Sequence, residues 1–141
     1  MILRRFEVGN IYSAFDDDRT EGILSYPEAF IDMDKDEYIY LKWVAIFEDK
    51  LPEPPSDIFL DNKGNTISLF TETGYRKFRS HLRWMKSYIE DQTEYTWIRK
   101  EYEAPAEDVC KPIYKDSLQM IFNLDDWNRY IEGGNKNDQI L

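Results

Sequence analysis

The apolar residues between positions 75 and 89 recur every three or four residues, which is the period of an α-helix. The residues with this spacing are Tyr75, Phe78, Leu82, Met85 and Ile89. The opposite side of such a helix is polar and basic, and the Thr73 hydroxyl can cap its start. We therefore predict a long amphipathic helix that packs its apolar face against the core.

Residues 38–47 are apolar or aromatic at almost every position, a pattern typical of a strand buried on both faces. We predict a central strand there, preceded by a polar turn at residues 32–37. Further along, Asn62, Gly64 and Asn65 tolerate the positive backbone angles of a hairpin turn. This turn predicts a hairpin between strands at residues 58–60 and 66–70, after a rigid connector that contains Pro52, Pro54 and Pro55.

The last third of the chain predicts two more strands and a helix. Residues 95–102 could extend the long helix or form a strand, and their β-branched and aromatic side chains favour the strand. Residues 117–122 predict the second strand, after a loop bounded by prolines. Asn123 can cap a short final helix over residues 124–131, which Gly133 and Gly134 are expected to end.

Strands grouped around one long helix, without regular alternation, indicate an α+β fold. We predict a single domain over residues 1–134, with a mostly antiparallel sheet packed against the long helix and the short C-terminal helix. Residues 135–141 are predicted to form a flexible polar tail. A chain of 141 residues is long enough to bury a core without disulfides or metal.

The composition predicts a cytoplasmic protein that does not enter membranes. Cys110 is the single cysteine, so no internal disulfide can form. The first residues lack the apolar run of a signal peptide, and no stretch approaches the roughly 20 apolar residues that cross a bilayer.

The net charge is −10 and is unevenly distributed. Residues 71–100 carry a local charge of +3, which leaves −13 on the remainder. Such a surface repels nucleic acid and attracts basic proteins. We therefore expect no direct binding of nucleic acid, although the basic side of helix 75–90 is an alternative binding face.

Asp32, Asp34 and Asp36 alternate as in a calcium-binding loop, but the loop is incomplete. Glu37 stands where the turn needs glycine, and Trp43 stands where a bidentate glutamate is needed. We therefore predict no metal site. No glycine-rich phosphate loop is present either, so we predict no nucleotide cofactor.

Residues that could act in catalysis are few. His81 has no second histidine for zinc and is interpreted as a helix-edge residue beside Trp84. Cys110 follows Glu107 and Asp108, which would raise the pKa of its thiol and make it inert.

A metal-dependent nuclease remains an alternative. In that case Glu48 would bind magnesium together with Asp32 or Asp34, and Lys50 would position the attacking water. Because this short pattern is common and the net charge opposes DNA binding, we predict that the protein is not an enzyme.

Acidic residues interleaved with tyrosines form the predicted partner-binding surface. Tyrosine anchors an interface at low entropic cost, and the carboxylates around it accelerate encounter with a basic partner. The residues assigned to this surface are Asp16, Asp17, Asp18, Tyr26, Asp32, Asp34, Asp36, Glu37 and Tyr38.

This combination, a short acidic chain with exposed aromatics and no cofactor motif, resembles the immunity proteins of bacterial toxin–immunity systems, including those of contact-dependent inhibition. The resemblance implies a non-enzymatic inhibitor, a monomer or weak dimer, that neutralises a cognate toxin, often a nuclease, by covering its cationic active-site region. A DNA-mimic inhibitor from a phage or mobile element is the second interpretation of the same features.

Overall fold

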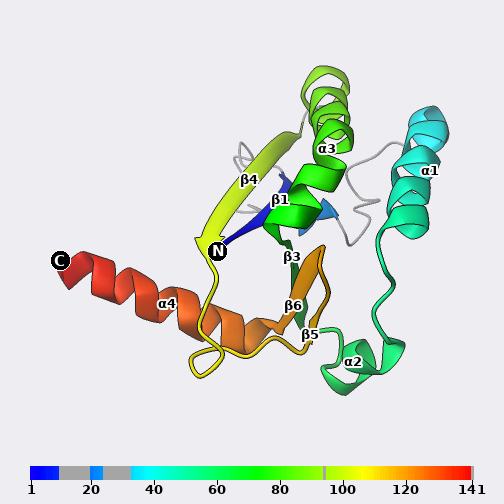
Figure 1. Ribbon diagram of the computed structural model, residues 1–141. Helices are drawn as coiled ribbons and strands as arrows, with labels where there is room; N and C mark the ends of the chain where they lie inside the picture. The colour runs from blue at the N-terminus through cyan, green and yellow to red at the C-terminus, as the bar shows by residue number, and fades with distance from the viewer. Residues whose placement is uncertain (10–19, 24–32, 94, 141) are drawn as a thin grey trace.

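The computed structural model describes the backbone of residues 1–9, 20–23, 33–93 and 95–140, without the side chains of residues 20, 21, 33–37, 39, 40 and 134–140. Within these residues the chain forms six strands and four helices (Figure 1). In chain order they are β1 (Ile2–Gly9), β2 (Thr20–Gly22), α1 (Met33–Lys50), α2 (Ser56–Asp61), β3 (Thr66–Phe70), α3 (Glu72–Gln92), β4 (Thr96–Glu103), β5 (Tyr114–Lys115), β6 (Gln119–Asn123) and α4 (Leu124–Ile140).

The strands form one sheet, in which β1 pairs with three other strands. Along one edge β1 pairs with β4 over its whole length, from Ile2 opposite Glu103 to Gly9 opposite Thr96. The other edge of β1 is shared by β3 and β2, and the sheet continues from β3 to β6 and β5. Every pairing among the described strands is antiparallel, which confirms the predicted α+β class with an antiparallel sheet.

Helices cover both faces of the sheet and enclose two hydrophobic clusters. On one face, α1 and α3 lie side by side (Figure 1), and Phe47 and Phe78 pack there against Phe6 and Phe70 of the strands. On the other face, Trp127 of α4 packs with a second cluster that includes Leu3, Leu69 and Phe122. Alternate residues of β1 and β3 therefore contribute to opposite clusters, as expected from the two-residue period of a strand.

The predicted central strand at residues 38–47 is wrong, because this segment belongs to helix α1. Trp43 and Phe47 are one helical turn apart and both are buried, whereas Tyr38 and Leu41 on another side are exposed. A short run that is apolar on every side fits a buried strand and a helix equally well. Of the acidic residues of the predicted turn, Asp34, Asp36 and Glu37 lie in the first part of α1, where the helix dipole favours negative charge.

The predicted hairpin is also wrong, because the segment after the prolines forms α2 and not a strand. Pro55 lies at the N-cap of this helix, a position that tolerates the missing N–H of proline. The turn joins α2 to β3, and the prediction of positive backbone angles holds at Gly64, with φ 70°. The other positive φ, 53°, is at Lys63 and not at Asn62 or Asn65. The side chain of Asn62 donates to the Ile58 carbonyl at 2.7 Å and closes the end of α2.

The long amphipathic helix is confirmed as α3, with Phe78, Leu82, Met85 and Ile89 buried. It begins earlier than predicted, because Thr71 caps the helix in place of Thr73. The Thr71 hydroxyl accepts a hydrogen bond from the backbone N–H of Gly74 at 3.1 Å.

The predicted late elements are confirmed as β4, β6 and α4, with Asn123 capping α4 by accepting a hydrogen bond from the N–H of Asp126 at 3.1 Å. The final helix is longer than predicted, because it continues through Gly133 and Gly134 to Ile140. Glycine within a helix costs only about 1 kcal/mol, so it does not by itself end one. None of the helices in the described segments is both long enough and apolar enough to cross a membrane.

Candidate functional site

The structure describes part of the predicted partner-binding surface. Asp16, Asp17, Asp18, Tyr26 and Asp32 lie outside the described residues. Asp34, Asp36 and Glu37 lie in the N-terminal part of α1, and their side chains are not described. The Tyr38 side chain is described, and 75% of its surface is exposed.

Helix α1 exposes apolar side chains that follow the helical repeat. Leu41, which lies about one turn after Tyr38, is 53% exposed, and Ala45 one turn later is exposed as well. Glu48 and Asp49 continue the same side of the helix and are exposed. We call Tyr38, Leu41, Ala45, Glu48 and Asp49 the α1 outer stripe. Large apolar side chains exposed next to one another on a helix are typical of interaction surfaces.

The acidic charge continues from the α1 outer stripe into α2. Between residues 48 and 61 the chain has one basic residue, Lys50, and five exposed carboxylates. These carboxylates are Glu48, Asp49, Glu53, Asp57 and Asp61. Among the described residues none of them forms an ion pair, so this end of the molecule presents uncompensated negative charge.

A pocket of about 580 Å³ adjoins the C-terminal end of α1. It lies between α1, the connector to α2, and strands β3 and β6. Its lining consists of Arg5, Phe47, Glu48, Leu51, Pro52, Glu53, Pro54, Phe59, Gly64, Thr66, Ser68, Gln119 and Ile121. This volume is within the usual range of ligand-binding pockets.

The connector that forms one wall of this pocket is fixed by the turn between β5 and β6. The buried side chain of Gln119 donates to the Pro52 carbonyl at 2.8 Å. Asp116 orders this turn by accepting hydrogen bonds from the N–H groups of Leu118 and Gln119 at 2.8 and 3.0 Å. Because the connector also contains three prolines, the wall loses little conformational entropy when a ligand binds.

Arg5 of the pocket lining forms an ion pair with Glu7, a carboxylate that it shares with Lys100. Its guanidinium pairs with the buried Glu7 and donates to the Ser68 carbonyl at 3.1 Å, and Lys100 approaches Glu7 to 2.9 Å. Burial by itself raises the pKa of Glu7, but hydrogen bonds from Lys100 and Arg5 outweigh burial and hold the pKa below its ordinary value. Glu7 is therefore ionised at neutral pH, whereas Glu48 and Glu53 in the lining have no such partner within the described part of the chain.

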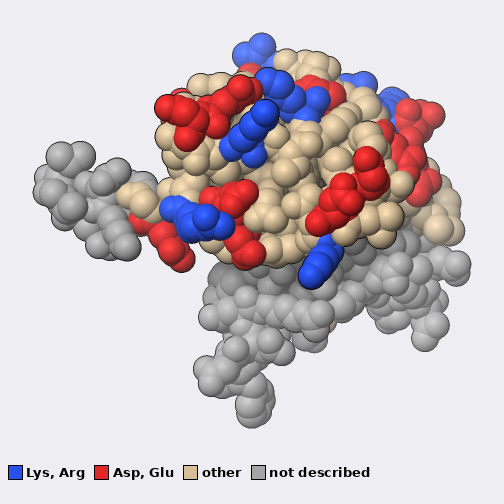
Figure 2. Space-filling model, turned by 90° about the horizontal axis from the view of Figure 1, so that it is seen from below, with Lys and Arg blue, Asp and Glu red and all other residues tan. Residues whose placement is uncertain are grey.

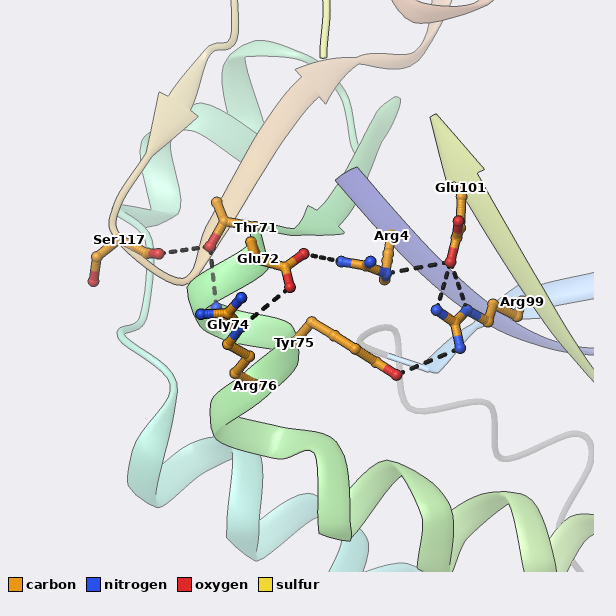
Figure 3. Close-up of polar contacts among 9 residues, drawn as sticks. All are labelled: Arg4, Thr71, Glu72, Gly74, Tyr75, Arg76, Arg99, Glu101 and Ser117. Carbon is orange, nitrogen blue, oxygen red and sulfur yellow. Dashed lines mark hydrogen bonds and ion pairs between the residues drawn. The ribbon is translucent and has the colours of Figure 1, made fainter. Parts of the chain in front are cut away.

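The polar network in Figure 3 joins the sheet to α3 and has no free charge. Arg4 pairs with Glu72 of α3 and with Glu101 of β4, and its guanidinium lies 4.4 Å from the centre of the Tyr75 ring. Glu101 also accepts from Arg99 at 2.9 Å. Because every charge in this network has an opposite partner, its role is to fix α3 against β1 and β4.

The exposed basic residues of α3 form a second charged surface. Arg76 pairs with Glu72 at 3.2 Å, and Lys77 donates to the backbone carbonyl of Lys50 at the end of α1. Three further basic residues of α3 are exposed and form no ion pair with any other described residue. They are Arg79, Arg83 and Lys86. Helix α3 contacts α1 through Lys77, His81 and Trp84, and by helical spacing Arg79, Arg83 and Lys86 lie on another side of α3. They therefore provide a control surface for variants of the α1 outer stripe.

His81 lies between α3 and α1, in contact with aromatic rings. It stacks on Trp84 at 5.4 Å, as the sequence interpretation expected, and meets the edge of Phe47 at 5.3 Å. Burial lowers the pKa of His81 to about 4, opposed by a hydrogen bond with the backbone of Trp43 and assisted by the charges of Lys42 and Lys50. The imidazole is therefore neutral at pH 7.

We expect the His81 pKa to make the protein less stable as the pH falls from about 6.5 toward 4. The unfolded chain binds the proton at the ordinary pKa of 6.5, before the folded chain does, so protonation favours unfolding in this range. The loss should reach about 1 kcal/mol at pH 5 after allowance for solvent screening. Urea unfolding at pH 7.5 and 5 should show this loss in the wild type and not in His81→Gln; equal losses in both would contradict it.

Cys110 is buried and forms no disulfide. Burial raises the pKa of its thiol, and the charge of Asp126 adds to this effect. The sequence correctly predicted that the pKa of this thiol is raised, but the increase was attributed to Glu107 and Asp108.

The nuclease alternative does not fit the position of Asp34. Glu48 and Asp34 are fourteen residues apart within α1, a separation of about 21 Å along the helix axis. Two residues at that separation cannot bind one metal ion. Within the segments described, no group of three or more His, Cys, Asp or Glu side chains is arranged to bind a metal.

Comparison with family models, with curated proteins and with solved structures found no match to this chain.

Proposed function

We propose that this protein is a non-enzymatic inhibitor of the immunity type, which binds a cognate bacterial toxin with a basic surface, often a nuclease, and blocks its active-site region. The contact surface in this proposal is the α1 outer stripe together with the acidic residues around it. The observation that carries the proposal is the position of Tyr38 and Leu41, which are largely exposed on a helix that continues into unpaired carboxylates.

The apolar side chains of this surface contribute to affinity, and its acidic side chains contribute to the association rate. A helix that is already folded loses little entropy on binding, and an exposed tyrosine and leucine supply the apolar area that anchors an interface. The carboxylates of α1 and α2 accelerate encounter with a basic protein and orient it. We also propose that the protein acts in the cytoplasm, where a free thiol such as that of Cys110 stays reduced.

Replacing Tyr38 and Leu41 together with alanine should weaken binding of the partner by at least tenfold, because the apolar anchors are lost while the charge is unchanged. The partner is first captured from the native host, identified, and produced separately. Its affinity for each variant is then measured by calorimetry, and inhibition of its activity is assayed.

The control is Arg79→Ala combined with Arg83→Ala, which alters an exposed side of α3 away from its contacts with α1. This control should bind at least as tightly as the wild type does, because it removes positive charge from a protein that is proposed to bind a basic partner. Equal affinity of the Tyr38→Ala/Leu41→Ala variant and the wild type would exclude the α1 outer stripe as the contact surface, and catalytic turnover by the purified chain would refute the proposal.

The DNA-mimic interpretation predicts a different surface. A mimic needs a continuous array of carboxylates at phosphate-like spacing, whereas Figure 2 shows acidic side chains in separate groups with basic side chains between them on the face that it presents. An inhibitor that covers a nuclease active site would also compete with DNA. The mimic is therefore favoured over the immunity proposal only if duplex DNA displaces this protein from a captured DNA-binding protein that is not a toxin.

A further inference from the structure

We infer that the pocket at the end of α1 holds a long basic side chain, arginine or lysine, from the bound protein. This inference rests on the proposed function and assigns the pocket as the anchor point of the interface. The pocket and the α1 outer stripe are continuous, because Glu48 belongs to both.

The walls of the pocket suit the aliphatic part of such a side chain. Phe47, Leu51, Pro52, Pro54, Phe59 and Ile121 provide apolar lining from α1, the connector, α2 and β6. Arginine and lysine bury their methylene stems against apolar surface and keep the charged group near polar partners. An apolar pocket with a few polar groups is therefore suited to a side chain of this amphipathic kind.

The polar groups of the pocket suit a cationic end group. Glu48 and Glu53 are exposed carboxylates without an ion-pair partner among the described residues, while the one basic residue of the lining, Arg5, is already paired with Glu7. Thr66 and Ser68 alternate along β3 and add two hydroxyl groups to the lining. Hydrogen bonds to ionised carboxylates are about twice as strong as bonds between neutral groups, so a guanidinium or ammonium group is the favoured occupant.

The size of the pocket indicates a segment of protein. A volume of about 580 Å³ matches that of a drug-sized ligand and exceeds the space of one side chain. The basic residue therefore enters together with neighbouring parts of the partner chain. The rigid proline connector keeps the pocket formed before binding, which lowers the entropic cost.

The inference can be tested without the partner, with Nα-acetyl-arginine amide as the probe and the uncharged Nα-acetyl-norleucine amide as its control. We expect millimolar binding of the arginine compound, with amide shifts in heteronuclear NMR spectra confined to residues that line the pocket. The norleucine compound should bind at least tenfold more weakly. Absence of binding, equal binding of the two compounds, or shifts elsewhere would overturn the inference.

Two double variants each remove two negative charges, one pair inside the pocket and the other pair outside it. Glu48→Gln combined with Glu53→Gln should weaken arginine-amide binding at least tenfold. Asp57→Asn combined with Asp61→Asn removes two exposed charges of α2 that do not line the pocket, and should change binding no more than twofold. Equal effects of the two double variants would mean that only general electrostatic attraction acts, and would refute a specific pocket.

Failure of this inference and failure of the proposed function give different results. If the captured toxin binds Glu48→Gln/Glu53→Gln as tightly as the wild type but loses affinity for Tyr38→Ala/Leu41→Ala, the pocket is not the anchor and the function stands. If the pocket binds arginine amide but the protein inhibits no basic partner, the proposed function fails.

Discussion

Replacing Gly74 with alanine is expected to lower the free energy of unfolding by roughly 3 kcal/mol, the upper part of the usual range for overpacking. Gly74 is the third residue of α3, where the helix meets the turn between β5 and β6. A Cβ atom at this position would lie 1.9 Å from the carbonyl oxygen of Leu118, so backbone would have to move.

The backbone at this junction cannot move freely, because hydrogen bonds hold it on both sides. The Leu118 carbonyl accepts from the N–H of Thr71 at 3.0 Å, and the Thr71 hydroxyl donates to the Ser117 carbonyl at 2.6 Å (Figure 3). The same hydroxyl caps α3 at Gly74. Relief of the clash would therefore break the helix cap, the contact with the turn, or both.

Urea unfolding followed by tryptophan fluorescence measures this effect, and Gly133→Ala is the matched control. Gly133 lies within α4, and a Cβ atom added there would have open space around it. Alanine at this position should therefore stabilise the protein by up to about 1 kcal/mol. Opposite signs for the two substitutions are the expected result. An unchanged midpoint for Gly74→Ala would show that the turn does not pack against α3 as described.

Replacing Trp127 with alanine is expected to cost about 3–5 kcal/mol, as large-to-small changes of aromatic core residues do. Trp127 is 2% exposed and is the main side chain through which α4 packs on the sheet. Its ring lies 4.9 Å from the ring of Phe122 and 5.1 Å from that of Tyr102. Removal leaves a cavity between α4 and strands β4 and β6.

The control for this prediction is Asn128→Ala, since Asn128 is the next residue of α4 and is exposed. It should change the free energy of unfolding by less than about 0.5 kcal/mol. Thermal unfolding followed by circular dichroism compares the two variants. Similar midpoints would contradict the packing of α4 beneath the sheet.

The elements that sequence patterns predicted correctly are those that bury a single face. In α3, Phe78, Leu82, Met85 and Ile89 repeat with helical spacing, and the structure buries all four. Strand β4 alternates between more and less buried residues, as its β-branched and aromatic content predicted. In such segments the pattern of burial and the local propensity favour the same structure, so no tertiary information is needed.

The strand predicted at residues 38–47 was wrong because this part of α1 does not have a single apolar face. This segment is apolar on two sides, one that contacts the core through Trp43 and Phe47 and one that carries Tyr38 and Leu41 to the surface. A partner-binding helix gives this pattern, because its outer side is apolar for a reason other than folding. The feature that misled the secondary-structure prediction is therefore the feature on which the proposed function rests.

The pocket was not predictable from the sequence, because its residues come from separate segments. Arg5 belongs to β1, Ser68 to β3 and Gln119 to β6, and each is unremarkable in its own segment. The run that contains Pro52, Pro54 and Pro55 was correctly predicted to be a connector, but nothing local indicates that it packs against the turn at Gln119.

By itself the sequence determined the fold class, the long helix and the acidic character of the chain, because these depend on composition and on spacing between near neighbours. Only the tertiary structure decided that residues 38–47 are helical, that Tyr38 and Leu41 face solvent, and that a pocket with two unpaired carboxylates adjoins them. Exposure and pairing depend on which distant segments cover a side chain, and neighbours in sequence carry no information about that.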